Sequence, residues 1–234
     1  AKMKKQITFL SIFLFLLGFS NVKLPLIFSD GMVLQRNKKI PVWGWAEVNE
    51  KIDLHFNKQH KTVITDANGK WMVNLDPEKA GGPFQLTVSG KNKITIQDVL
   101  VGEVWICSGQ SNMEFQMYKL PKFKALKEKI NNPEVRQFGE AQDLSGSPKE
   151  QLKQGKWQLA NKENLADFTA VGYFFAEKLN KELHVPIGII NTSWGGTCVE
   201  TWTSREAFQK SDEFKEMIAQ VPVVDMDAIF EKYK

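Results

Sequence analysis

The stretch "VGEVWICSGQS", residues 101–111, decides the fold of the second half of this chain. Apart from Glu103, its residues are apolar as far as Cys107, which predicts a strand buried on both faces of a sheet. The run stops at Ser108-Gly109, and Ser111 follows at the expected start of a helix. A serine at such a turn is exposed, and the unpaired backbone N–H groups behind it favour negative charge that develops on a substrate.

A second buried strand is expected at residues 187–191, after a helix. Apolar residues recur at intervals of three and four before it, which predicts one amphipathic helix that ends before Pro186. They are Leu165, Phe168, Val171, Phe175, Leu179 and Leu183. The order strand, helix, strand predicts a parallel sheet covered on both faces, so residues 99–234 are expected to form an α/β domain.

Residues 22–98 follow a different pattern, in which apolar and polar residues alternate. This alternation marks half-buried strands at residues 52–56, 71–75 and 84–88. The sequence at residues 66–69, Asp-Ala-Asn-Gly, predicts a hairpin, and Gly-Gly-Pro at residues 81–83 predicts another reversal. Short strands at this spacing favour an antiparallel β-sandwich domain.

The first twenty residues predict a secretory signal peptide, and hence a secreted or periplasmic protein. Lys2, Lys4 and Lys5 precede an apolar stretch at residues 7–19 that is too short for a membrane anchor, so we expect no membrane association after cleavage. Removal of these three lysines lowers the formal charge from +4 to +1. The remaining lysines are scattered, which excludes a basic surface for nucleic acid.

The two cysteines, Cys107 and Cys198, lack the spacing of a metal site. We expect them to be buried free thiols, although one disulfide between them stays open as an alternative. No other stretch has metal-ligand spacing or a phosphate-binding loop, so the sequence implies no metal and no organic cofactor.

Two motifs closely resemble those of the sialate O-acetylesterases, a family of the SGNH-hydrolase superfamily. They are "GEVWICSGQSNMEF", residues 102–115, and "GIINTSWGGTCVETWTS", residues 188–204. The stretches "LPLIFSDGMVLQR", residues 24–36, and "VWGWA", residues 42–46, resemble the β-domain that precedes the catalytic domain in this family. The resemblance extends from about residue 24 to about residue 206. It implies an N-terminal antiparallel β-sandwich followed by an SGNH-type, flavodoxin-like parallel sheet.

By this resemblance Ser111 is the nucleophile, and its own N–H is one donor of the oxyanion hole. Gly195 or Gly196 would supply another donor, because a glycine leaves room for a substrate carbonyl to reach its N–H. Four residues beside the motifs are candidates for substrate binding or, equally, for holding the loops: Asn112, Glu114, Glu200 and Trp202.

The resemblance also implies a Gly-Glu-Ser-Asn type segment and a late Asp-x-x-His that supplies the base, and neither occurs in these 234 residues. His55 and His60 lie in the predicted β-domain. His184 precedes the amino end of the second buried strand, opposite the edge that carries Ser111. We therefore expect an incomplete parallel-sheet domain, the N-terminal portion of a longer esterase whose missing C-terminal part is a partner, and little activity in this chain alone.

The activity that the resemblance implies is removal of O-acetyl groups from sialic acid by a serine carboxylic-ester hydrolase. Acetylxylan or another acetylated glycan is the alternative substrate. A non-catalytic carbohydrate-binding protein is the alternative from another class, with Trp43 and Trp45 stacking on sugar instead of packing in the core.

Overall fold

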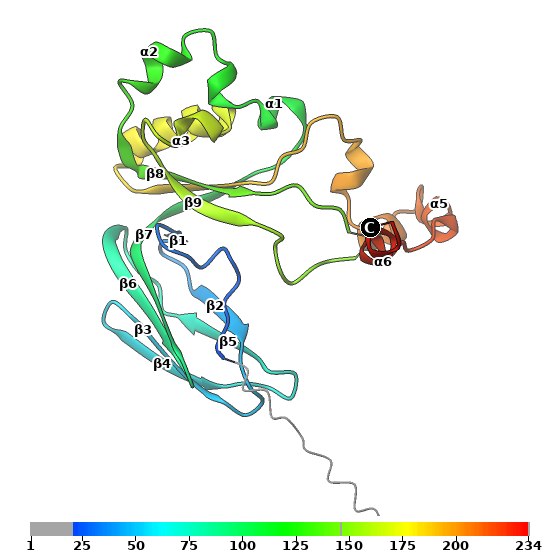
Figure 1. The fold of residues 1–234 in the computed structure, drawn as a ribbon, viewed down its shortest axis with the longest axis horizontal. Coiled ribbons are helices and arrows are strands. Elements are labelled where there is room, and N and C mark those ends of the chain that lie inside the picture. The colour runs from blue at the N-terminus through cyan, green and yellow to red at the C-terminus, as the bar shows by residue number, and fades with distance from the viewer. Residues whose placement is uncertain (1–20, 146, 234) are drawn as a thin grey trace, which may run out of the picture.

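A single strand, β7 (Lys93–Cys107), runs through both halves of the molecule (Figure 1). The computed structural model describes residues 21–145 and 147–233, so the predicted signal peptide at residues 1–20 lies outside the described residues. The first part of β7 pairs with strands of the N-terminal half, and its last part, from Glu103, pairs with the α/β sheet. The boundary expected between residues 98 and 99 falls inside this continuous strand.

The N-terminal half is built from short strands in two sheets. Its strands are β1 (Val33–Gln35), β2 (Ile40–Trp45), β3 (Lys51–Phe56), β4 (Gln59–Ile64), β5 (Lys70–Leu75) and β6 (Gly81–Ser89). Strands β4, β3, β6 and β7 pair antiparallel in that order, β1 pairs with β7 in parallel, and β2 pairs with β5 in a separate sheet. The predicted alternation is confirmed in β3 and β5, where every second side chain is buried.

The two predicted reversals differ from expectation. The turn at residues 66–69 forms, with the Gly69 N–H donating to the Asp66 carbonyl at 3.0 Å, but it joins strands of different sheets. The expected hairpin there is wrong, because β4 pairs with β3 and β5 pairs with β2. The Gly-Gly-Pro stretch does not reverse the chain either. It lies at the start of β6, where the register with β7 shifts and forms a bulge.

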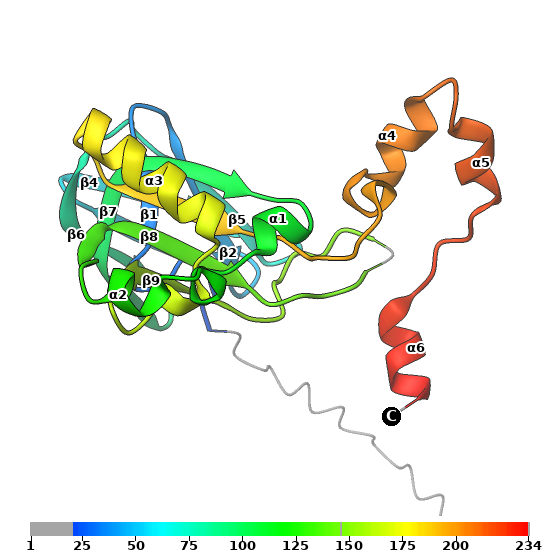
Figure 2. The same ribbon diagram turned by 90° about the horizontal axis from the view of Figure 1, so that it is seen from above.

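The second half contains the predicted parallel sheet. Strands β7, β10 (Ile187–Asn191) and β8 (Asn132–Glu140) are parallel in that order, and β9 (Gly155–Ala160) adds an antiparallel edge. Helix α3 (Ala170–Leu183) lies across one face of this sheet (Figure 2). On the other face Gly188 of β10 contacts β1, since a Cβ at Gly188 would lie 2.7 Å from Val33 Cβ. Both faces are thus covered at β10, one by a helix and the other by the N-terminal half. The end of β7 was also expected to be buried on both faces, and this is wrong, because Trp105 and Ile106 are 45% and 70% exposed.

Helix α3 forms where a helix was predicted, but its buried face differs. The side chains that face the sheet are mostly small, and the buried positions are Ala170, Gly172, Tyr173, Ala176 and Asn180. Gly172 lies so close to β7 that a Cβ would be 2.9 Å from Cys107 Sγ. Three residues of the expected apolar stripe, Val171, Phe175 and Leu183, are instead 49%, 41% and 42% exposed. The prediction was wrong because close helix–sheet approach selects small residues over large ones.

The remaining helices are short. They are α1 (Ser111–Glu114), α2 (Phe123–Lys127), α4 (Arg205–Lys210), α5 (Lys215–Gln220) and α6 (Met226–Lys232), with 3₁₀ turns at Met117–Lys119, Leu165–Asp167 and Val199–Trp202. Helices α4, α5 and α6 lie to one side of the sheets in both views (Figures 1 and 2). Across residues 21–145 and 147–233, none of the helices has the length and apolar character needed to cross a membrane.

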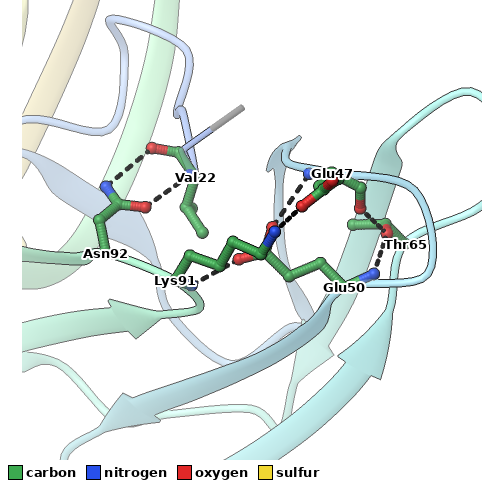
Figure 3. Close-up of polar contacts among 6 residues, drawn as sticks. All are labelled: Val22, Glu47, Glu50, Thr65, Lys91 and Asn92. Carbon is green, nitrogen blue, oxygen red and sulfur yellow. Dashed lines mark hydrogen bonds and ion pairs between the residues drawn. The ribbon is translucent and has the colours of Figure 1, made fainter. Parts of the chain in front are cut away.

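A cluster of polar contacts holds the start of the described chain to the first sheet (Figure 3). Asn92 accepts a hydrogen bond from the Val22 N–H at 2.6 Å and donates to its carbonyl at 3.2 Å. The carboxylate of Glu50 is buried, and it accepts from the N–H groups of Glu47 and Lys91. These bonds compensate the burial of a charge, which is costly without partners.

Arg136 of β8 connects the two halves. Its side chain is 3% exposed, and its Nη1 donates to the carbonyls of Gly31 and Asp98 at 2.9 and 2.6 Å. Nη2 donates to the Asp98 carboxylate at 3.0 Å, and Nε donates to the Pro133 carbonyl at 2.9 Å. The guanidinium therefore joins β8 to the turn before β1 and to the middle of β7.

Replacement of Arg136 by alanine should destabilise the protein strongly. The buried carbonyls that now accept from the guanidinium would lose their partners, so Arg136→Ala should lower the free energy of unfolding by about 2–4 kcal/mol. Urea denaturation followed by tryptophan fluorescence measures this difference. Arg36→Ala is a matched control, because the Arg36–Glu103 pair is partly exposed and should contribute no more than about 1 kcal/mol. Equal losses in the two variants would contradict this role for Arg136.

Candidate functional site

The loops that follow β7 and β10 lie side by side at the carboxyl edge of the parallel sheet. The two strands run in register as far as Cys107 and Asn191. Beyond them the Thr192 N–H donates to the Cys107 carbonyl at 3.0 Å, and the Trp194 N–H donates to the Gly109 carbonyl at 2.9 Å. These two backbone bonds bring the two sequence motifs together.

Ser111 is the first residue of α1 and is exposed at this edge. Gly109 has φ +132°, a conformation that favours glycine, and it lets the chain turn sharply between β7 and α1. The first N–H groups of a helix have no intrahelical acceptor, so those around Ser111 are free to bind an anion. The Ser111 hydroxyl has no hydrogen-bond partner within residues 21–145 and 147–233, so its oxygen is open to a ligand.

Gly195 lies directly against α1. A Cβ built on Gly195 would be 3.6 Å from Ser111 Cα and would collide with Glu114 Oε2. The other carboxylate oxygen of Glu114 accepts from Gln142 Nε2 at 2.7 Å. Gly196, with φ +78°, has open space around its Cβ position. The Glu114 side chain therefore connects α1, of which it is the last residue, to the Gly195 loop and to the segment that follows β8.

A cavity of about 430 Å³ opens beside these loops. Its walls include Trp194, Thr197 and Trp202 from the loop after β10, and Glu140, Gln142 and Asp143 from the end of β8. Thr197 Oγ1 accepts from Trp202 Nε1 at 2.8 Å and donates to the Trp194 carbonyl at 2.8 Å, which fixes one wall. Burial, and secondarily the nearby Asp143 charge, raise the pKa of the Glu140 carboxyl. Ser111 is beside this cavity and is not one of its lining residues.

The other predicted site residues do not all lie at this cavity. Trp202 lines the cavity and is 38% exposed. Asn112 is exposed on α1. Glu200 lies in the 3₁₀ turn Val199–Trp202 and lines a different hollow, toward α4 and α5. Ser111, Gly195, Glu114 and Trp202 are therefore gathered at one edge, whereas Glu200 faces away from the cavity.

All three histidines of the chain lie away from Ser111. His55 and His60 stack on each other at 4.1 Å between β3 and β4, and His60 contacts Asp53. His184 ends α3 with φ 53°, before the amino end of β10, as expected. Ser111 is at the carboxyl end of the same sheet, so none of these rings reaches its hydroxyl.

The cavity wall that β8 supplies was not predicted from the sequence. Glu140 is the last residue of β8, and Gln142 and Asp143 follow it at the edge that carries Ser111. The short run Val135 to Phe138, which is buried throughout, was the available signal. Because the polar residues Arg136 and Gln137 interrupt this run, the strand was not recognised from its apolar pattern.

Both cysteines are free, but only Cys107 is buried. The expectation of burial is wrong for Cys198, which lies in the exposed loop after Gly196. In the portion of the chain that the structure covers, no group of three or more His, Cys, Asp or Glu side chains is arranged to hold a metal ion.

Comparison with known sequences shows similarity to a family of carbohydrate esterases. Residues 101–229 match the family described as carbohydrate esterase, sialic acid-specific acetylesterase. The sialate O-acetylesterase of Rattus norvegicus is 34% identical over 201 residues, which cover 76% of this chain and 36% of the relative. That of Homo sapiens is 33% identical over 199 residues, which cover 75% and 38%. The chain thus spans little more than a third of the length of the curated relatives it matches.

A solved structure has the same fold. The crystal structure of a carbohydrate acetylesterase from Xanthomonas citri is 39% identical and superimposes with a TM-score of 0.79. The match covers 86% of this chain and 46% of that one. The predicted fold class, an N-terminal antiparallel β-sandwich followed by an SGNH-type α/β sheet, is confirmed.

The two cysteines should react at very different rates with a chromogenic aromatic disulfide. Cys198 is exposed, whereas Cys107 is 4% exposed and burial raises its pKa, so it forms less thiolate at any given pH. We expect one of the two thiols to react fast in the native protein and both to react after denaturation. Cys198→Ser should remove the fast phase, and Cys107→Ser should retain it. A fast phase that survives Cys198→Ser would show that the β7 end opens.

Proposed function

Because this chain belongs to the sialic acid-specific acetylesterase family of carbohydrate esterases, we propose that its Ser111 attacks acetyl esters of sialic acid. One observation carries the proposal. An exposed serine at the start of α1 lies against Gly195, and both belong to the loops that two backbone hydrogen bonds hold together. A hydroxyl nucleophile beside free N–H groups is the arrangement that acyl transfer requires.

In the proposed reaction, Ser111 Oγ forms a bond to the acetyl carbonyl carbon while a base accepts its proton. The N–H of Ser111 and an N–H of the Gly195-Gly196 loop stabilise the negative charge on the carbonyl oxygen. The bond between the carbonyl carbon and the sugar oxygen then breaks, and the sugar hydroxyl leaves with the proton. Water hydrolyses the acetyl-serine and releases acetate.

The base in this proposal is not one of the three histidines, given their positions. We propose that the described residues lack the His/Asp part of the triad and that this chain alone turns over slowly. Loss of a triad member lowers turnover on the order of 10⁴-fold or more. In this proposal the chain supplies the nucleophile, Ser111. The proton acceptor is not among residues 21–145 and 147–233.

Another acetylated glycan, such as acetylxylan, is the second candidate substrate. The relative from Xanthomonas citri is described as a carbohydrate acetylesterase, which names a wider class of sugar. The cavity beside Ser111 has tryptophan walls and a half-buried carboxyl, which suit a sugar without selecting one. Export is also part of the proposal, because residues 1–20 have the composition of a secretory signal peptide.

Acetylation of Ser111 by an activated ester tests the nucleophile directly. We expect p-nitrophenyl acetate, with imidazole added as an external base, to acetylate Ser111. Once the imidazole is removed the acetyl-serine should be long-lived, because its hydrolysis also needs a base. Mass spectrometry of peptides locates the acetyl group.

Ser108→Ala is the matched control, since Ser108 is also exposed and lies three residues away. The label should persist in Ser108→Ala and disappear in Ser111→Ala. An acetyl group on lysines alone, with the Ser111 peptide unmodified, would reject Ser111 as the nucleophile.

A further inference from the structure

A second cavity, of about 570 Å³, lies on the N-terminal half, against the β2–β5 sheet. Strand residues Trp43 and Trp45 alternate with Gly44, so their rings project from the same face of β2. Across the ladder they pair with Met72 and Lys70, which project from that face as well. All four residues line the cavity. The face of this small sheet is therefore aromatic over its centre.

The aromatic surface is held in place and remains accessible. Trp43 packs edge-on against Phe28, with ring centroids 4.7 Å apart, and both tryptophans of β2 are half-buried. Ile64 and Met72, beside them, are 63% and 58% exposed. Rigid aromatic rings lose little conformational entropy when a ligand packs on them. The surface is thus preformed for a flat apolar partner.

Charged groups surround this aromatic surface. Asp66, Lys70, Lys149 and Glu150 all line the cavity, and their formal charges cancel. Lys70 pairs with Glu150, and the Trp45 ring also hydrogen-bonds Glu150, so its carboxyl is fixed at the rim. An apolar face within a neutral, hydrogen-bonding rim matches a neutral pyranose, which has an apolar C–H face and hydroxyl groups around its edge.

One segment connects this cavity to the one beside Ser111. The connection between β8 and β9 supplies Gln142 and Asp143 to the first cavity and Lys149 and Glu150 to the second. Lys149 pairs with Asp143 at 3.1 Å, so the two walls are tied together. A glycan held at one cavity therefore contacts the same short segment as a sugar at the other.

We propose that the Trp43–Trp45 face of the β2–β5 sheet is a second carbohydrate-binding site, which holds neutral pyranose units of the glycan that carries the acetylated sugar. Only the link to an acetylated sugar rests on the proposed function. Binding of the neutral units depends on the aromatic face, the charged rim and the cavity alone.

The test uses the whole chain with Ser111→Ala and follows the indole N–H signals of its seven tryptophans by NMR. The probes are N-acetyllactosamine and xylotetraose, added separately, which distinguish an animal-type from a plant-type glycan. We expect the signals of Trp43 and Trp45 to shift with at least one sugar. The signal of Trp105, which is 45% exposed on β7, should stay unchanged.

Two variants locate the site. Trp45→Ala should weaken binding about tenfold, which corresponds to about 1.4 kcal/mol. Glu150 lies in a loop outside the sheet, and Glu150→Ala should weaken sugar binding to a smaller extent. If Trp45→Ala does not fold, the Glu150→Ala result decides the test. Trp105→Ala is the matched control and should bind as tightly as the parent, with thermal unfolding confirming that each variant is folded.

The proposal is overturned if neither sugar shifts the Trp43 and Trp45 signals. It is equally overturned if the folded Trp45→Ala and Glu150→Ala variants keep the parent affinity. Neither sugar carries an acetyl ester and Ser111 is replaced, so a failure of Ser111 acetylation would leave this result unaffected.

Discussion

The uninterrupted pairing of β7 is the constraint on which the rest of the structure depends. Its first part is held by β6 and β1, and its last five residues are held by β10. At the change between these partners the chain needs Gly102, because any Cβ there would collide with the Pro186 carbonyl. The sandwich and the parallel sheet are therefore parts of one hydrogen-bonded structure, and Ser111 is positioned by contacts that begin more than a dozen residues before it.

The candidate site follows from where β7 and β10 end. Because they are parallel neighbours in register, their loops leave the sheet at the same edge, and two backbone bonds join them. Glycine at position 195 lets that loop lie against α1, and Glu114 fills the space that remains. The site is thus assembled mainly by backbone geometry, which explains why small residues matter as much there as the serine.

Much of this was predictable from the sequence. Period-two alternation identified β3 and β5, and continuous apolar runs identified β10 and the end of β7, because these strands are stabilised by local side-chain pattern. Strand β8 was not predicted, because Arg136 and Gln137 interrupt its apolar run and the burial of Arg136 depends on carbonyls supplied by distant residues. The buried face of α3 was missed because Phe175 packs against Trp105 on the exposed side, at 5.2 Å, while alanine and glycine face the sheet. The proximity of Ser111 and Gly195 was expected only from the motif resemblance and the strand order. Neither of these indicated the contact between Gln142 and Glu114.

The continuity of β7 also limits how its length can change. Side chains along a strand alternate between faces, so inserting or deleting one residue between Lys93 and Cys107 would exchange inward and outward positions for everything beyond that point. The sandwich and the loop that carries Ser111 would then need opposite side-chain orientations along the same strand. The packing of one of the two would be lost. A change of length should therefore be tolerated better in the turns at either end of β7 than within the strand, so this one strand sets the spacing between the N-terminal sheet and the loop that carries Ser111.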